Sequence, residues 1–152
     1  MSIWLRTPSL EHLNAATPGT MMRHLDIVFT EVGPDFLRAT MPVDERTRQP
    51  YGLLHGGASC VLAETLGSLG SALHAGPGRI TVGIEISASH HRGASGGEVT
   101  GVATLLHGGR TMTTYEIVIT DEAGRRVCTS RLSCLLRDAV PGGGAVPSRT
   151  GA

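Results

Sequence analysis

The chain has 152 residues, of which 40% are hydrophobic and 17% are charged, so it can fold as a single globular domain with a substantial core. Its formal net charge is zero, which argues against a nucleic acid or an anionic membrane as partner, because both require a basic surface. All of its basic residues are arginine. The absence of lysine excludes Schiff-base and pyridoxal phosphate chemistry, and the phosphate-loop motif that ends in Gly-Lys.

The three cysteines, at positions 60, 128 and 134, are odd in number and form no Cys-x-x-Cys pair. We therefore expect buried free thiols in a reducing compartment rather than disulfides or a zinc ribbon. The N-terminal region has no basic segment followed by an apolar run, so we expect no signal peptide and a cytoplasmic protein. The most apolar window, residues 56–73, carries Glu64 near its middle, which favours a buried helix over a membrane span.

The pattern of apolar residues predicts secondary structure in chain order. Thr7-Pro8 predicts a short helix over residues 8–16, and Leu62, Leu66, Leu69 and Leu73 predict a long helix over residues 57–74. The expected strands span residues 24–31, 37–43, 81–91, 98–107, 111–120 and 126–136.

The last four of these strands are separated by short loops that contain glycine, which favours consecutive antiparallel hairpins. We therefore predict an α+β fold in which an antiparallel sheet packs on one long helix. Residues 1–138 form a single domain in this interpretation. Residues 139–152 are rich in Gly and Pro and are expected to be a flexible tail.

Glu64 is the only charged residue between Gly56 and Leu73. A helix that is apolar nearly all round is buried, and an unpaired buried carboxylate costs several kcal/mol. A catalytic carboxylate in a cleft would explain Glu64, and an ion pair with an arginine would explain it as well. From the helix pattern alone, the two explanations are about equally good.

The start of this helix is rich in small residues. His55-Gly56-Gly57 lies where free backbone N–H groups and the positive end of the helix dipole gather. Glycine also lets a substrate oxygen approach the backbone closely, so this segment is a candidate oxyanion site.

Other candidates have less support. His90 and His91 are adjacent on a predicted strand and should face opposite sides, so at most one should face the site and no metal site is expected. Cys60 lies one turn before Glu64 without a histidine base, which favours a packing role. No Gly-x-Ser-x-Gly motif is present, so a serine hydrolase is not supported.

The segment Gln49-Pro-Tyr-Gly-Leu-Leu-His-Gly-Gly57, with Glu64 seven residues after its last glycine, resembles the signature of hotdog-fold acyl-CoA thioesterases. The resemblance extends from Ile3 to Leu136. It is strongest to the branch that contains 1,4-dihydroxy-2-naphthoyl-CoA thioesterase of menaquinone synthesis and one type of 4-hydroxybenzoyl-CoA thioesterase. It implies a hotdog fold, in which an antiparallel sheet wraps around a long central helix.

The resemblance also implies roles for individual residues. Glu64 would be the nucleophile or general base and Ser68 would help to hold it, whereas Gln49, His55 and the Gly56 N–H would come from the partner subunit of a homodimer, so that the site exists only in the dimer. Dimers of this family commonly pair into tetramers. The substrate would be an acyl-CoA, with no further cofactor. The residues expected near coenzyme A are His90, Arg92, Gly57 and Arg110, the last of these in a Gly109-Arg110 pair where relatives often have Gly-Ser.

Two other functions remain open at this stage. A hotdog dehydratase or hydratase would need a histidine and an acid facing the acyl Cα and Cβ, and the spacing from His55 to Glu64 fits the thioesterase pattern better. A non-catalytic acyl-CoA-binding protein of this family would normally carry a DNA-binding domain, for which this chain has neither the length nor the charge.

Overall fold

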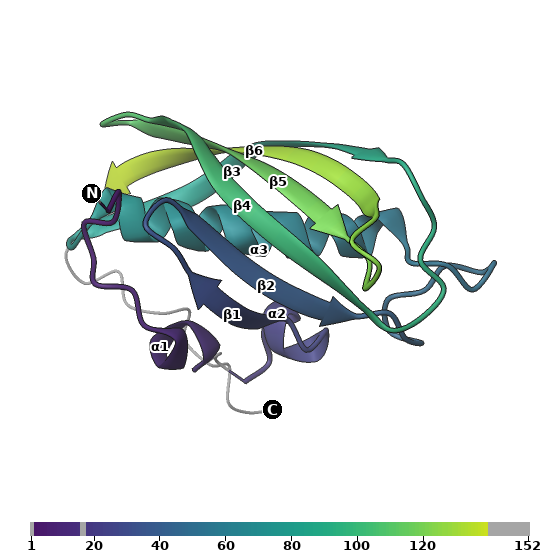
Figure 1. Cartoon of the computed structure of the whole chain (residues 1–152). Helices are drawn as coiled ribbons and strands as arrows, with labels where there is room; N and C mark the ends of the chain where they lie inside the picture. Colours follow the sequence, from purple (N-terminus) through teal and green to yellow (C-terminus); the bar gives the residue numbers. More distant parts are fainter. Residues whose placement is uncertain (1, 16–17, 140–152) are drawn as a thin grey trace, which may run out of the picture.

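The computed structural model describes residues 2–15 and 18–139. The tail predicted for residues 139–152 lies outside the described residues, except for Ala139. Helix α3 (Gly56–Ala75) runs through the centre of the molecule, and the sheet curves around it (Figure 1). This is the arrangement expected from the sequence.

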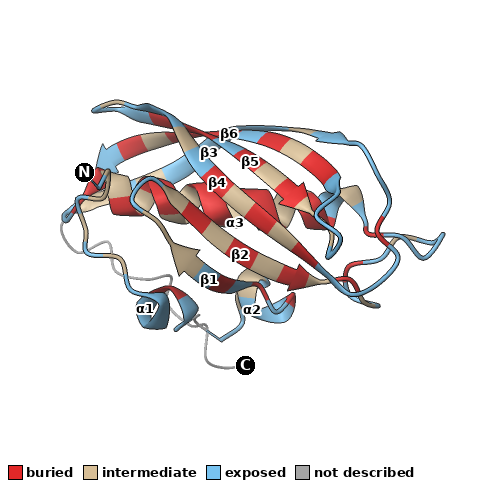
Figure 2. Ribbon diagram, viewed as in Figure 1, coloured by how far each residue is buried: buried red, intermediate tan, exposed pale blue. Residues whose placement is uncertain are grey.

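A six-stranded, fully antiparallel sheet makes up the rest of the domain, in the order β1-β2-β4-β5-β6-β3. Its strands are β1 (Val28–Val32), β2 (Phe36–Pro42), β3 (Arg79–His90), β4 (Glu98–Gly108), β5 (Met112–Thr120) and β6 (Arg126–Asp138). Buried residues alternate with more exposed ones along β2 and along parts of β4 and β5, as they do in strands with one face on a core (Figure 2).

Helix α3 fills the concave side of this sheet. Leu62, Leu66 and Leu73 are buried and Leu69 packs against the same core, which confirms the apolar stripe expected from their spacing. His55 caps the helix, because its side chain accepts a hydrogen bond from the Gly57 N–H.

Glycines let the helix approach the sheet closely. A Cβ atom at Gly67 would lie 2.5 Å from the Leu132 side chain, and one at Gly101 on β4 would lie 2.6 Å from Leu66. The helix and sheet thus approach each other closely at points where a glycine on one receives a leucine side chain from the other.

Strand pairing differs from the sequence prediction at one point. The β4–β5 and β5–β6 pairs are the expected hairpins, but β3 pairs with β6 and does not contact β4 as a hairpin partner. The segment after His90 instead crosses to the other side of the sheet, where β4 lies between β2 and β5. The Gly-rich segment 93–97 is therefore part of a crossover connection.

The N-terminal elements also differ in extent. The first helix, α1, covers Leu10–Asn14 with Ser9 as its N-cap, and is therefore shorter than the predicted 8–16. A second helix, α2 (Met21–His24), occupies residues just before and at the start of the predicted 24–31 strand, and β1 begins only at Val28. A single turn is too short to leave a periodic signal in the sequence.

Strand β3 is an exposed edge of the sheet. It is 12 residues long, and four large aliphatic side chains on it are exposed: Ile80, Val82, Ile84 and Ile86. A long apolar edge strand is prone to pair with another strand unless something covers it.

None of the helices within the described ranges is long and apolar enough to cross a bilayer.

The contact between Gly70 and Tyr115 gives a test of this packing. A Cβ at Gly70 would lie 2.9 Å from the Tyr115 ring, which is fully buried and rigid. Helix propensity alone favours Gly70→Ala by about 1 kcal/mol, but overpacking costs about 1–3 kcal/mol, so we expect the free energy of unfolding to fall by up to about 2 kcal/mol. Urea denaturation measures this, with Ala72→Gly in the same helix to calibrate propensity. A stabilised Gly70→Ala protein would contradict the close approach.

Candidate active site

Glu64 lies near the middle of α3 and faces a cavity of about 370 Å³. The cavity is mostly apolar, lined by Met21, Cys60, Val61, Glu64, Thr65 and Ile86. The carboxylate is half-buried, whereas the sequence analysis expected full burial. The difference arises because this side of the helix faces the open edge at β3 and is incompletely covered by the sheet. Cys60, for which we expected a packing role, is half-buried and contributes to the cavity wall.

Two neighbours fix the Glu64 carboxylate. The Ser68 hydroxyl donates a hydrogen bond to Glu64 Oε1 over 3.2 Å, one helical turn away. Gly83 on β3 leaves the space that the carboxylate occupies, since a Cβ there would lie only 2.2 Å from Oε1. Among the described residues, Glu64 takes part in no ion pair, so the structure gives no support to the alternative that an arginine neutralises it.

At the start of α3, the backbone amides of Gly56 and Gly57 differ in their hydrogen bonding. The Gly57 N–H donates to His55 Nδ1 over 2.8 Å, whereas the Gly56 N–H has no hydrogen-bond acceptor within the described part of the chain. Gly56 also packs against His90, because a Cβ at this position would lie 2.8 Å from His90 Nε2. The free amide of Gly56 points to the role expected for an oxyanion donor.

A second cavity, of about 330 Å³, lies at this end of α3. Its lining includes Gln49, Gly56, His90, His91 and Arg92. The expectation that at most one of the two histidines would face the site is wrong. Strand β3 ends at His90, so alternation no longer governs His91, whose Nε2 lies 2.9 Å from the Thr129 hydroxyl oxygen. The Gln49 side chain accepts a hydrogen bond from the Tyr51 N–H.

Within one chain, these residues do not form one site. Gly56 and Glu64 line different cavities, and their eight-residue separation corresponds to about 12 Å along the helix axis. One carbonyl group cannot contact both. Arg110 lies in the turn between β4 and β5, where its backbone oxygen accepts from Arg79, and it lines neither cavity.

Gly83, Met21 and Ile86 contribute to the Glu64 environment but were not selected from the sequence. Gly83 carried a signal, because a glycine inside a strand often marks a bulge or a close approach. The pairing of β3 with β6 does shift between Gly83 and Glu85. No sequence signal marks Met21 or Ile86, because an apolar residue that lines a cavity cannot be told by sequence from one that lines a core.

The thiols and possible metal ligands are less informative. Burial raises the pKa of Cys128 to about 11 and raises that of Cys134 as well, so both thiols are protonated at neutral pH and are poor nucleophiles. In the ranges that the structure describes, no group of three or more His, Cys, Asp or Glu side chains could hold a metal ion.

A carboxylate in an apolar cavity and a free amide at a helix start are groups of the kind that enzymes acting on activated carbonyl groups use. The sequence profile of the Thioesterase superfamily matches residues 51–128. The proofreading thioesterase EntH of Cronobacter sakazakii is 61% identical over 131 residues, which cover 86% of this chain and 96% of that protein. Its counterpart in Cronobacter turicensis is 60% identical over the same share of each chain.

Solved structures agree with this match. A thioesterase of Haemophilus influenzae has a TM-score of 0.89 at 39% identity and covers 93% of this chain and 99% of its own. A thioesterase variant from Pseudomonas aeruginosa has a TM-score of 0.88 at 42% identity, with 91% and 100% covered. The chain belongs to the thioesterase superfamily and has the hotdog fold, and the protein is a thioester hydrolase.

The contact between Gly83 and Glu64 generates a prediction. Gly83→Ala would place a methyl group where the carboxylate lies, while the backbone of this strand position has no positive φ that would exclude alanine. We expect a folded protein whose kcat/KM for thioester hydrolysis falls by at least about tenfold, because a small misplacement of a catalytic group has a large effect. Thiol release measures this. Gly96→Ala, where a new Cβ meets only an ordinary contact at 3.7 Å, is the control. Unchanged hydrolysis by Gly83→Ala would show that the position of Glu64 is not critical.

Proposed function

We propose that the protein hydrolyses aromatic or related acyl-CoA thioesters to the free acid and coenzyme A, with Glu64 as nucleophile or general base. The observation that carries the proposal is a half-buried carboxylate, hydrogen-bonded by Ser68, in a cavity whose other walls are mostly apolar. A cavity of about 370 Å³ lies at the small end of the range for ligand pockets, which suits a compact acyl group.

The chemistry needs few groups. As a general base, Glu64 takes a proton from water, whose oxygen attacks the thioester carbonyl carbon. The C–S bond then breaks and the proton returns to the leaving thiolate. As a nucleophile, Glu64 would instead form an anhydride that water hydrolyses. A single turnover in ¹⁸O-labelled water distinguishes the two, because only the anhydride route carries label into Glu64.

The Gly56 N–H would stabilise the negative charge that develops on the carbonyl oxygen. His55 would support it as the helix cap, and Gln49 would border the same cavity. His90 and Arg92 in this cavity, with Gly57 and Arg110 further out, are the groups we assign to coenzyme A, whose phosphates suit arginine. No cofactor beyond the substrate is needed.

A homodimer would bring the two halves of the site together. The 12-residue apolar edge of β3 is a surface that a second copy can extend by antiparallel pairing, and the two-fold symmetry of such a pair makes every contact reciprocal. Because Gly83 and Ile86 on β3 border the Glu64 cavity, a copy that pairs along this edge would lie close to Glu64. We further propose that dimers pair into tetramers and that the protein is cytoplasmic.

The acyl group can be narrowed by experiment. The resemblance to the naphthoyl-CoA branch favours an aromatic acyl group and a place in menaquinone synthesis. The 61% identity to a proofreading thioesterase favours a second role, the removal of wrong acyl groups from thioesters. A thiol-release screen over aromatic, fatty and short acyl-CoAs separates them. One dominant aromatic substrate supports the first role, and broad acceptance of unrelated acyl groups supports the second.

Replacing the carboxylate tests the core of the proposal. We expect Glu64→Gln to remain folded and to bind acyl-CoA but to lose at least about 10²–10³ in kcat, because no other residue in the cavity can accept the proton. Thiol release and a binding titration measure the two effects. Glu45→Gln, at an exposed loop position outside both cavities, should retain full activity. Near-normal turnover by Glu64→Gln would end the proposal.

Hybrid oligomers test whether the site is shared. Gly56→Pro removes the candidate oxyanion N–H at the first helical position, where the helix backbone accepts proline and the exposed His90 ring, 2.8 Å from a Cβ there, must shift. Each of the Glu64→Gln and Gly56→Pro proteins should be nearly inactive alone. Purified hybrid dimers should regain up to about half of the wild-type activity per dimer, because one of their two sites then has both groups. Well-folded hybrids that stay inactive would contradict a shared site.

A further inference from the structure

Met21 lies between two cavities. It lines the cavity of about 370 Å³ that contains Glu64, and it also lines a larger cavity of about 610 Å³ beside α2. The described residues around the larger cavity are Gly19, Thr20, Met21, Arg23, His24 and Arg46. Met21 is the only residue that the two lining sets share, and its side chain is 59% exposed, so it is packed tightly against neither wall.

Helix α2 places Met21 there, although a helix of four residues has no stability of its own. Two buried side chains, Leu25 and Ile27, follow it in the core, and Met22 packs against that core. The helix ends in a Schellman arrangement: the Ile27 N–H donates to the Met22 oxygen and the Asp26 N–H to the Arg23 oxygen. Met21 therefore has a fixed backbone position.

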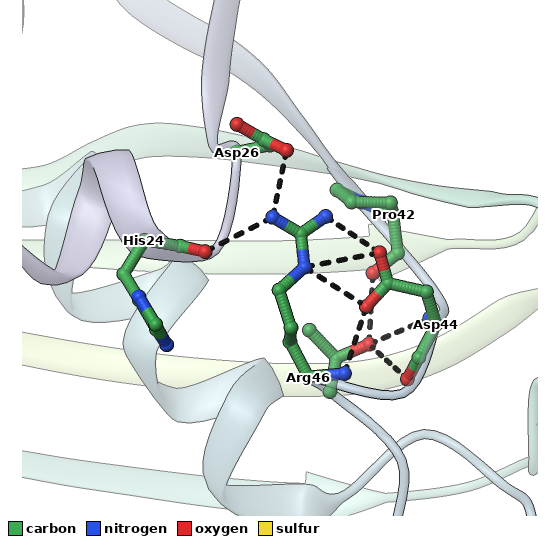
Figure 3. Close-up of polar contacts among 6 residues, drawn as sticks. His24, Asp26, Pro42, Asp44 and Arg46 are labelled. Atoms are coloured by element: carbon green, nitrogen blue, oxygen red, sulfur yellow. Dashed lines mark hydrogen bonds and ion pairs between the residues drawn. The ribbon is translucent and has the colours of Figure 1, made fainter.

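Arg46 holds the other end of α2 (Figure 3). Its Nη1 donates to the His24 carbonyl oxygen over 3.1 Å and to Asp26 Oδ2 over 2.7 Å, while its Nη2 donates to Asp44 Oδ2 over 2.6 Å. Hydrogen bonds from the Arg46 side chain lower the pKa of Asp44, so this carboxylate is charged at neutral pH. The cation also lies at the C-terminal end of α2, where the helix dipole favours it.

Asp26, which binds Arg46, has a strained backbone conformation. Its φ of 49° is left-handed, and it is the only non-glycine residue among the described residues with a positive φ. Glycine is the usual residue at this position of a Schellman motif. An aspartate there tolerates the strain and supplies a carboxylate that glycine lacks, and this carboxylate binds Arg46.

We propose that Met21 is a specificity-determining residue, which closes the acyl cavity beside Glu64 and limits the length of the acyl chain, and that Arg46 positions it through α2. This rests on the proposed function, because it assigns the Glu64 cavity to the acyl group. With methionine at position 21, the acyl group is confined to the smaller cavity. With a smaller side chain, the two cavities join and a longer chain can extend into the larger one.

The test compares the chain-length profile of variants. For Met21→Ala we expect the ratio of kcat/KM for decanoyl-CoA to that for benzoyl-CoA to rise about tenfold, since the fit of one or a few methylenes is worth roughly 10–200-fold. The conservative variant Met21→Leu should keep the wild-type ratio. Met112→Ala, at an exposed methionine that lines neither cavity, is the matched control and should also keep it.

Arg46→Gln separates positioning from folding. We expect its KM for benzoyl-CoA to rise several-fold with kcat within about twofold of wild type, because Arg46 touches neither Glu64 nor the substrate cavity. A fall in kcat with unchanged KM would contradict the positioning role.

The rate of thiol labelling tests the role of Met21 without relying on catalysis. Cys60 lines the Glu64 cavity, and Cys128 and Cys134 are buried, so a bulky maleimide should label mainly Cys60. Met21→Ala should accelerate this labelling at least about threefold over Met112→Ala, because it removes side-chain atoms that line the cavity. An unchanged chain-length ratio together with unchanged labelling would overturn the role of Met21.

The Glu64→Gln variant distinguishes this failure from failure of the proposed function. If hydrolysis requires Glu64 but the chain-length profile of Met21→Ala matches that of wild type, only the proposal that Met21 closes the acyl cavity is wrong. If hydrolysis of every acyl-CoA in the panel survives Glu64→Gln, the assignment of the site is wrong.

Discussion

The position of Glu64 depends on how closely α3 packs against the curved sheet. Glycines at the helix–sheet contact leave room for the side chains that face them, so α3 lies close to the sheet and the Glu64 side chain reaches β3 at Gly83, where there is no side chain to meet it. A carboxylate in the interior of the domain would cost several kcal/mol or take up a proton. At the edge of the sheet it keeps partial contact with water and accepts one hydrogen bond from Ser68.

With this placement, the proposed site is incomplete in a single chain. The free amide of Gly56 and the carboxylate of Glu64 are on one helix, and a rigid helix cannot fold back to bring them together. The carboxylate is also next to the apolar edge of β3, the surface that most needs covering. Stability and catalysis would therefore be linked, because the event that covers the edge strand would also bring a second helix start near the carboxylate.

The sequence predicted those features that depend on local pattern. The leucine spacing located α3 to within one residue at each end, and alternating residues located most strands. The crossover between β3 and β4 could not be predicted from the loop sequence, because Gly-rich segments serve hairpins and crossovers equally. The pairing of β3 with β6 joins residues more than 35 positions apart and depends on the packing of the whole sheet.

For the site, the sequence indicated residues whose chemistry is unusual for their surroundings. Glu64 stood out because it is charged in an apolar helix, and Gly56 because glycine begins that helix. Met21 could not stand out, since nothing in its own sequence neighbourhood records that α2 lies beside α3. The half-exposure of Glu64 could not be predicted from the sequence either, because it depends on which face of α3 the sheet leaves open.

This contrast suggests a division between chemistry and selectivity in the molecule. The main groups proposed for catalysis, namely Glu64, Ser68 and the Gly56 N–H, lie on α3, which is fixed by the core. The proposed limit on the acyl group lies on α2, a single turn held by a few peripheral contacts. A substitution at Met21 changes neither the helix–sheet contact nor the Glu64 carboxylate. Substrate range can therefore change through α2 while the catalytic geometry stays constant, and the strained Asp26, paired with Arg46, helps to keep α2 in one position.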